Sequence, residues 1–221
     1  MKMIKTIACF TVLAFFSSAI NAQAYNWESL KENQNLINVQ AGFDYGVVAG
    51  VGYGYRIKSK IPMVLHGDYS FPAGKNLLDD FKTRVGATAR LYDAGGLQVS
   101  ADITGVFRRN ENDMVRMVNF GSEMKAVAGY YRSGWLVAAE IGFDKAIVTH
   151  LKHSAVYKTS YPGVTDGWYI PTGGNFLYGV QGGFSFRKTD LYLKAGKTVM
   201  QDFKTTPLLP YYFEFGINRK F

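Results

Sequence analysis

The sequence has little of what disulfides, metal sites and spanning helices need. Cys9 is the only cysteine in 221 residues, and it lies in an apolar run that we expect to be removed on export, which leaves no disulfide or thiolate metal site. After this first run, no stretch approaches the roughly 20 apolar residues of a membrane-spanning helix. Basic residues outnumber acidic ones by 25 to 17, but they form no dense run. This spread argues against nucleic-acid binding.

The start of the chain has the pattern of a secretory signal peptide. Lys2 and Lys5 precede the apolar run Ile7–Phe16, and Ala22-Gln23-Ala24 supplies the small residues that a signal peptidase needs. Cleavage after Ala24 lowers the formal net charge from +8 to +6. We predict three segments: a cleaved signal peptide over 1–24, a periplasmic lead-in without strands over 25–34, and a β-barrel over 35–221.

Apolar and polar residues alternate along most of the remaining chain, with the period of a β-strand that has one apolar face. In the last such run, Phe213, Phe215 and Ile217 alternate with Glu214 and Gly216. We find about ten runs: Leu36–Tyr45, Val48–Ile57, Met63–Phe71, Phe81–Tyr92, Leu97–Arg108, Phe120–Tyr131, Trp135–Ile147, Phe176–Arg187, Leu191–Val199 and Tyr211–Phe221.

The connections between these runs differ in length, which is typical of an outer-membrane barrel with short periplasmic turns and longer surface loops. The longer ones are Ala73–Asp80, Asn110–Met117, Thr149–Gly174 and Met200–Pro210. Only helices and closed barrels satisfy every backbone group in lipid. We therefore predict an all-β, closed antiparallel transmembrane barrel of about ten strands, with eight or twelve left open. A soluble secreted barrel or sandwich is the competing fold, but the unequal loops count against it.

The end of the chain carries a more specific pattern. Glu214, Gly216 and Phe221 resemble the C-terminal signal of the bacterial outer-membrane β-barrel superfamily. This chain departs from the pattern at Arg219, where the superfamily usually has an apolar residue. A residue so near the rim can extend its charge to the headgroups. The resemblance implies location in the outer membrane of a Gram-negative bacterium, contact with its lipids and insertion by the barrel assembly machinery. It does not imply an activity, because the superfamily hosts many.

The inward faces of the predicted strands carry both signs of charge. Interleaved acids and bases can pair, as buried charges must, and this favours a polar lumen that is largely filled. A narrow pore for ions or small solutes, with anions preferred because of the net positive charge, is the alternative. The predicted lumen network comprises Arg56, His66, Asp68, Arg84, Arg90, Asp102, Glu123, Glu140 and Glu214.

Two groups of residues invite a chemical interpretation, and neither supports one. His66, Asp68 and Ser70 share the inward face of one strand, but residues i and i+2 lie about 6.6–6.8 Å apart, too far for a direct nucleophile–base hydrogen bond. His150 and His153 have no carboxylate at an obvious ligand spacing. We predict no catalytic site, metal site or cofactor, with an outer-membrane hydrolase as a remote alternative.

The connection Thr149–Gly174 is long enough to indicate a function, because loops beyond about 12–15 residues are uncommon otherwise. It is rich in aromatic residues, which favours a folded loop over a disordered one. Its candidate binding residues are Tyr157, Tyr161, Trp168 and Tyr169. A loop packed on the barrel rim is the competing interpretation. We expect an envelope or extracellular protein partner, and a non-enzymatic role in envelope structure or binding.

Overall fold

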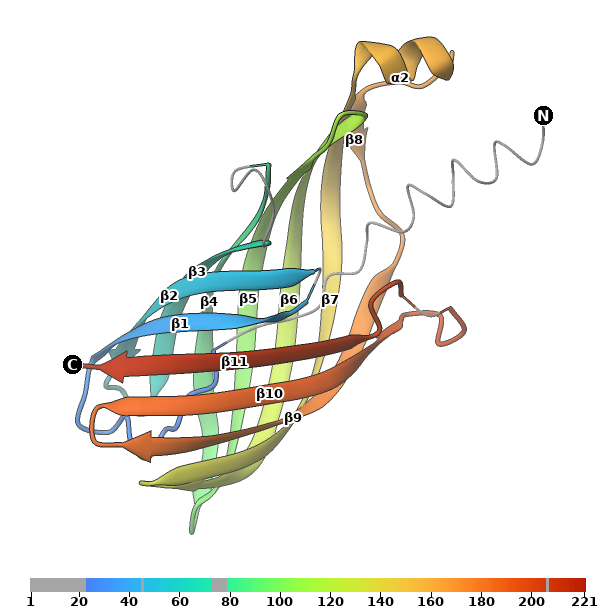
Figure 1. Ribbon diagram of the computed structural model, residues 1–221. Coiled ribbons are helices and arrows are strands. Elements are labelled where there is room, and N and C mark those ends of the chain that lie inside the picture. Colours follow the sequence, from blue (N-terminus) through green and yellow to red (C-terminus); the bar gives the residue numbers. More distant parts are fainter. Residues whose placement is uncertain (1–22, 45, 73–78, 206) are drawn as a thin grey trace.

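The computed structural model describes residues 23–44, 46–72, 79–205 and 207–221. Within these residues, ten antiparallel strands close into one barrel, in which β1 pairs with β11 and β6 pairs with β7 (Figure 1). The strands are β1 (Asn35–Phe43), β2 (Val47–Ile57), β3 (Met63–Pro72), β4 (Asp80–Ala94), β5 (Leu97–Glu111), β6 (Val115–Arg132), β7 (Trp135–His153), β9 (Gly174–Phe186), β10 (Thr189–Met200) and β11 (Tyr211–Lys220). The predicted closed barrel and its ten strands are confirmed.

Alternation of the side chains decides which face of each strand lies inside. Along β11 every second residue from Tyr212 to Lys220 is buried in the lumen, and the residues between them are exposed on the outside. The buried set is mostly polar or charged, and the exposed set is mostly aromatic and aliphatic. This is the inverse of a soluble barrel, and it is the arrangement of a barrel with lipid outside.

Two aromatic zones border the apolar outer surface. At the loop end, neighbouring rings run from Tyr69 through Phe81, Phe107 and Phe120 to Trp168, with centroids 5.1–6.4 Å apart. At the opposite end, the rings of Tyr130 and Trp135 lie 5.8 Å apart. Aromatic girdles at both interfaces are a property of outer-membrane barrels. No helix of the described residues has the length and apolar character needed to cross a membrane.

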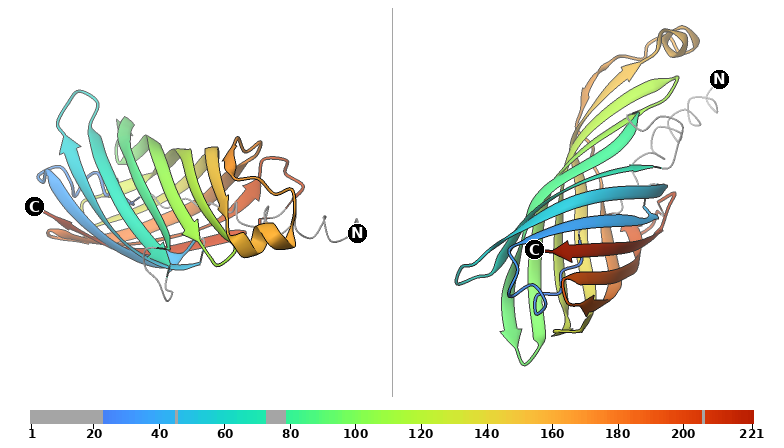
Figure 2. Two further views of the ribbon diagram at one scale, coloured as in Figure 1. Left: turned by 90° about the horizontal axis from the view of Figure 1, so that it is seen from above. Right: turned by 60° about the vertical axis from the view of Figure 1, so that its left-hand side comes forward.

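The turns at the end that holds the C-terminus are short. Gly95 and Gly96 have φ values of 61° and 100°, which glycine adopts without strain, and they join β4 directly to β5. The opposite end is uneven, because β5, β6 and β7 extend well beyond the other strands (Figures 1 and 2). Strands of 18 and 19 residues are longer than a tilted strand needs to cross a bilayer, about 9–11 residues.

The prediction of one of the longer loops was wrong. Asn110–Met117 is not a loop, because β5 continues to Glu111 and β6 begins at Val115. The side chain of Asn112 accepts hydrogen bonds from the backbone N–H groups of Met114 and Val115, both at 2.9 Å, and closes a tight turn. The charged ends of these strands were taken for a loop because their side chains break the apolar alternation outside the membrane.

Residues 1–22 of the predicted signal peptide lie outside the described residues, as do Tyr45 and most of the predicted loop Ala73–Asp80. Residues 25–34, predicted as a lead-in, contain no strand. They do not form a lead-in outside the barrel on the periplasmic side, however. Tyr25, Trp27 and Leu30 are buried inside it. This segment, residues 23–33, is called the lumen segment below.

Candidate functional site: the barrel lumen

The lumen segment is held by a small apolar core at the short-turn end of the barrel. Trp27 and Leu30 pack into a cluster of buried side chains that line the wall there: Leu36, Val64, Tyr131, Leu136 and Ala138. Burying a leucine side chain stabilises a fold by about 1.5–3 kcal/mol. The two apolar side chains therefore anchor the segment firmly against the wall.

Polar contacts fix the position of the lumen segment on several strands. The side chain of Asn26 donates to the carbonyl oxygen of Arg132 at 2.8 Å and to the hydroxyl of Ser185 at 2.7 Å. Glu28 accepts a hydrogen bond from Gln98 at 2.7 Å. The guanidinium of Arg56 donates to the carbonyl oxygen of Leu30 at 2.9 Å. The segment thus bridges walls that lie across the lumen from each other.

Farther along the lumen, ion pairs between different strands and turns line the wall. Lys82 and Asp44 lie 2.9 Å apart, and both side chains are fully buried. The Arg84 guanidinium contacts Asp68 at 3.0 Å. His66 lies 2.8 Å from Asp102, which belongs to β5. Paired charges of this kind make a polar interior tolerable.

Two buried charged groups in the same region form no hydrogen bond to another described residue. These atoms are the ammonium nitrogen of Lys125 and both carboxylate oxygens of Glu123. Leaving buried charged groups without partners costs several kcal/mol each, so such groups are normally solvated by internal water.

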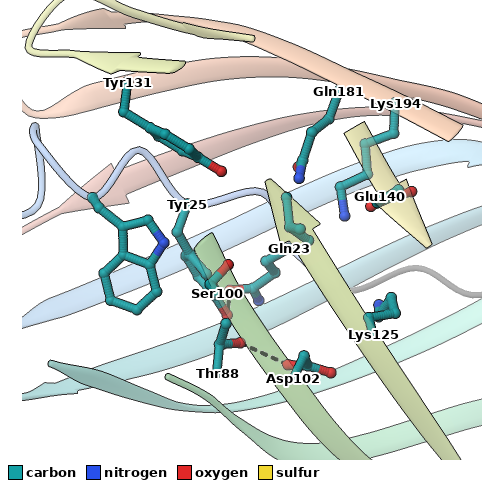
Figure 3. A pocket seen from close by; sticks show the side chains of 12 residues that line it. Gln23, Tyr25, Thr88, Ser100, Asp102, Lys125, Tyr131, Glu140, Gln181 and Lys194 are labelled. Atoms are coloured by element: carbon teal, nitrogen blue, oxygen red, sulfur yellow. Dashed lines mark hydrogen bonds between the residues drawn. The ribbon is translucent and has the colours of Figure 1, made fainter. Parts of the chain in front are cut away.

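A cavity of about 20 Å³ lies between the lumen segment and the wall, room for about one water molecule. Figure 3 shows Gln23 and Tyr25 of the lumen segment facing side chains from several strands around it, including Asp102, Lys125 and Glu140. Gln23 belongs to the predicted signal peptide. Gln23 lines the cavity, and its amide lies against Gly52 of the wall. Removal of Gln23 on cleavage would therefore enlarge this space.

Two tyrosines lie along the lumen wall, directly over glycines of neighbouring strands. The ring of Tyr212 covers Gly196 and Gly179, and its hydroxyl donates to Glu140 at 2.6 Å. The ring of Tyr192 covers Gly216, and its hydroxyl is bonded to Asn38 at 3.0 Å. A Cβ at these glycines would lie 2.2–2.3 Å from the tyrosine rings. The glycines are therefore required for the tyrosines to lie flat on the wall.

We expect Gly216→Ala and Gly196→Ala to destabilise the barrel by about 1–3 kcal/mol each, because an added methyl group overpacks the tyrosine contact. The measurement is the midpoint of urea unfolding in detergent micelles. Gly105→Ala is the matched control, since a Cβ there has only an ordinary contact of 3.7 Å with the carbonyl oxygen of Val85. An equal loss of stability in all three variants would contradict the tyrosine–glycine account.

The predicted lumen residues point inward, as far as the structure describes them. Seven are buried: His66, Asp68, Arg84, Asp102, Glu123, Glu140 and Glu214. Arg56 and Arg90 lie at the short-turn end, where both contact the lumen segment. The three residues considered for hydrolase chemistry have separate partners: His66 pairs with Asp102, and Asp68 and Ser70 both contact Arg84.

Sequence reasoning missed the lumen segment, although a signal was present. At the short-turn end, the inward residues Leu36, Val64, Tyr131 and Leu136 are apolar and interrupt the alternation. An apolar patch inside a polar lumen must be covered by other apolar groups. Trp27 and Leu30, which stand outside any predicted strand, were the available partners.

The predicted binding loop is folded and stands above the rim. β7 runs on to His153, α2 (Ala155–Ser160) follows, and β8 (Gly167–Tyr169) returns along β7. Figure 1 shows this extension projecting away from the barrel mouth and not across it. Trp168 packs on His150 with centroids 4.9 Å apart, and Tyr157 stacks on His153 and on Tyr161. Tyr169 hydrogen-bonds to Thr165.

A charged cluster holds the extension together. The backbone N–H of His153 and the ammonium of Lys158 donate to Asp166 at 2.8 and 2.6 Å, and these bonds hold the pKa of the Asp166 carboxyl below its ordinary value. A lowered pKa means that the ionised carboxylate stabilises the extension. This contribution is present above the ordinary pKa and is lost only as the pH falls through the lowered one.

The residues of the predicted assembly signal occupy different faces of β11. Glu214 and Gly216 face the lumen, where the ring of Tyr192 lies over Gly216. Phe221 is exposed on the outside, and its backbone exchanges hydrogen bonds with Asn35 at 2.9 and 3.0 Å. These two bonds close the end of the seam between β1 and β11. Arg219 also faces outward and donates to the hydroxyl of Thr189 at 2.9 Å.

No protein-family model and no curated protein matches the chain. Two solved structures of similar shape are described as KdgM porin, one of them in complex with disordered oligogalacturonate. They have 10% and 8% sequence identity and a TM-score of 0.43, and the alignments cover 84% of this chain and 99% of theirs. The sequence identities and the TM-score are low, so the fold is established by the strand pairing itself. The polar lumen, the apolar exterior and the aromatic zones define a transmembrane β-barrel of the bacterial outer membrane.

Proposed function

We propose that the protein is a narrow outer-membrane pore for ions and small solutes, constricted by its own lumen segment. The observation that carries the proposal is the pair of buried charged groups that form no hydrogen bond to another described residue, on Lys125 and Glu123, because water in the lumen would solvate them. The lumen segment fills only the short-turn end. Above Tyr25 the mature chain would leave the polar wall lined by side chains alone.

The buried charges also indicate the selectivity of such a pore. Among the described residues, eight acidic and six basic side chains are buried in the interior. Fixed charges in a narrow lumen attract ions of opposite sign. The net charge of the whole chain predicts a preference for anions, whereas this interior set favours cations.

The test is conductance and reversal potential of the purified, folded mature protein in planar bilayers under a KCl gradient. We expect small conductance steps and a weak preference for potassium over chloride. Heat-unfolded protein from the same preparation is the control for detergent and contaminants. Absence of steps both in the wild type and in a variant without the lumen segment would overturn the proposal. A chloride preference would show that basic groups at the entrances outweigh the buried acids.

The extension above the rim supports a second candidate, binding of an extracellular or envelope protein without enzymatic activity. Val156 and Tyr161 are 67% and 40% exposed there, at the end of the extension that holds α2 and beyond the aromatic zone that marks the membrane surface. Large exposed apolar side chains on a folded element are typical of binding surfaces. Replacing residues 155–166 by a short turn separates the two functions: binding would be lost while the conductance stayed unchanged.

A further inference from the structure

A row of three polar side chains crosses the seam of the barrel beside the lumen segment. Asn38 of β1, Asn218 of β11 and Asp190 of β10 lie directly opposite one another in the strand register, and all three are buried. The side-chain amide of Asn38 donates to the side-chain oxygen of Asn218 at 2.8 Å. The amide of Asn218 in turn donates to the backbone carbonyl oxygen of Ala24 at 2.8 Å.

That carbonyl belongs to the peptide bond at which the signal peptide is predicted to be cut. Hydrolysis between Ala24 and Tyr25 removes the carbonyl with the signal peptide and leaves the α-amino group of Tyr25 on the protein. A free α-amino group has an ordinary pKa of about 7.7–8.0 and is largely protonated at neutral pH. The cut therefore replaces a hydrogen-bond acceptor beside Asn218 by a cation with three hydrogen-bond donors.

The row has acceptors suited to such a cation. The side-chain oxygen of Asn38 is buried and has no hydrogen-bond partner. The Asp190 carboxylate, which binds Lys220 at 2.7 Å and the hydroxyl of Ser29 at 3.2 Å, supplies negative charge next to Asn218. The interior has more buried acids than bases, so one additional positive charge improves its balance.

We propose that Asn38 and Asp190, on either side of Asn218, form a docking site for the α-ammonium group of the mature chain. Signal-peptide cleavage then completes the lumen: the new terminus is bound by the wall, and Trp27 and Leu30 hold the rest of the segment in place. Capture of a terminal amine by polar groups is an established mode of peptide recognition. The proposal depends on the position of the cut and does not depend on whether the barrel conducts.

The test uses 2-pyridinecarboxaldehyde, which modifies α-amino groups, on the folded mature protein in detergent, with intact-mass detection. For the wild type we expect modification at least tenfold slower in the folded than in the urea-unfolded protein. Asn38→Leu removes the acceptor and should restore most of the unfolded rate. Asn38→Asp keeps an acceptor and should stay protected. Asn119→Leu, a buried asparagine bonded instead to Thr149, is the matched control and should also stay protected.

Four results would overturn the proposal. One is equal modification rates for the folded and unfolded wild type, which would mean that the amine is free. Another is full protection in Asn38→Leu, since burial alone would then explain the slow reaction. The third is a mass that places the mature terminus elsewhere than Tyr25. Loss of protection in both Asn38 variants would assign Asn38 a donor role and contradict the acceptor role proposed. The heat-modifiable band on gels shows which variants are folded.

Discussion

Deletion of residues 25–33 raises the single-channel conductance of the folded barrel several-fold over that of the full mature chain. The reason is geometric, because this segment occupies the lumen at the short-turn end and bridges strands across it through Asn26 and Glu28. The wall behind it is lined by Leu36, Val64 and Tyr131, which would become exposed to water. We therefore expect lower thermal stability together with the higher conductance.

A point variant separates the effect of the segment from that of the deletion itself. Trp27→Asp replaces the indole of the apolar core that anchors the segment by a carboxylate, and burying a charged group in an apolar core is costly. The segment should leave the wall, and the conductance should rise toward that of the deletion variant. Trp168→Asp makes the same chemical change at the outer rim and should leave the conductance unaltered. Equal conductance in wild type, deletion and Trp27→Asp, at equal folded fractions, would remove the constriction from the proposal.

The barrel was predictable from the sequence because lipid outside and water inside impose a strict alternation on every strand. In β11 the exposed Phe213, Phe215 and Ile217 and the buried Glu214 and Gly216 follow this rule without exception. The rule holds only where the strand crosses the membrane. Beyond it, β5 and β6 continue with charged residues such as Glu111, which contacts Arg109 on its own strand and Arg116 on β6. Alternation therefore gave the number of strands correctly and their loop-side ends incorrectly.

The polar wall of the lumen was predictable, whereas its partners were not. Period two places His66 and Asp102 on the inward face, but it gives no register between strands. The register between the strands places His66 beside Asp102 and Arg84 beside Asp68. The contact of Tyr212 with Glu140 also depends on register, because Gly196 and Gly179 lie in one row between them along the wall. The position of the lumen segment was not predictable either, because it follows from apolar side chains at the ends of four strands and not from a motif of its own.

Removal of Phe221 lowers the amount of folded protein in the outer membrane strongly, and it alters the stability of the barrel that does form much less. Phe221 closes the seam, because its backbone N–H and carbonyl are bonded to Asn35 of β1. Its exposed ring contributes about 1.5–3 kcal/mol when buried in the membrane interface. It is also the final aromatic residue of the pattern that resembles the outer-membrane assembly signal, so we expect impaired recognition to reduce the yield more than the lost burial does.

Phe186→Ala is the matched control, because it removes an exposed aromatic side chain at the same end of the barrel, on β9, outside the pattern. Arg219→Tyr restores the apolar residue that the pattern usually has and loses a hydrogen bond to Thr189. Its yield should equal or exceed that of the wild type. The measurement is the heat-modifiable folded band in outer-membrane fractions, quantified against the unfolded band. If deletion of Phe221 and Phe186→Ala reduced the yield equally, the loss would follow from apolar contact with lipid at this rim, and Phe221 would have no special role in assembly.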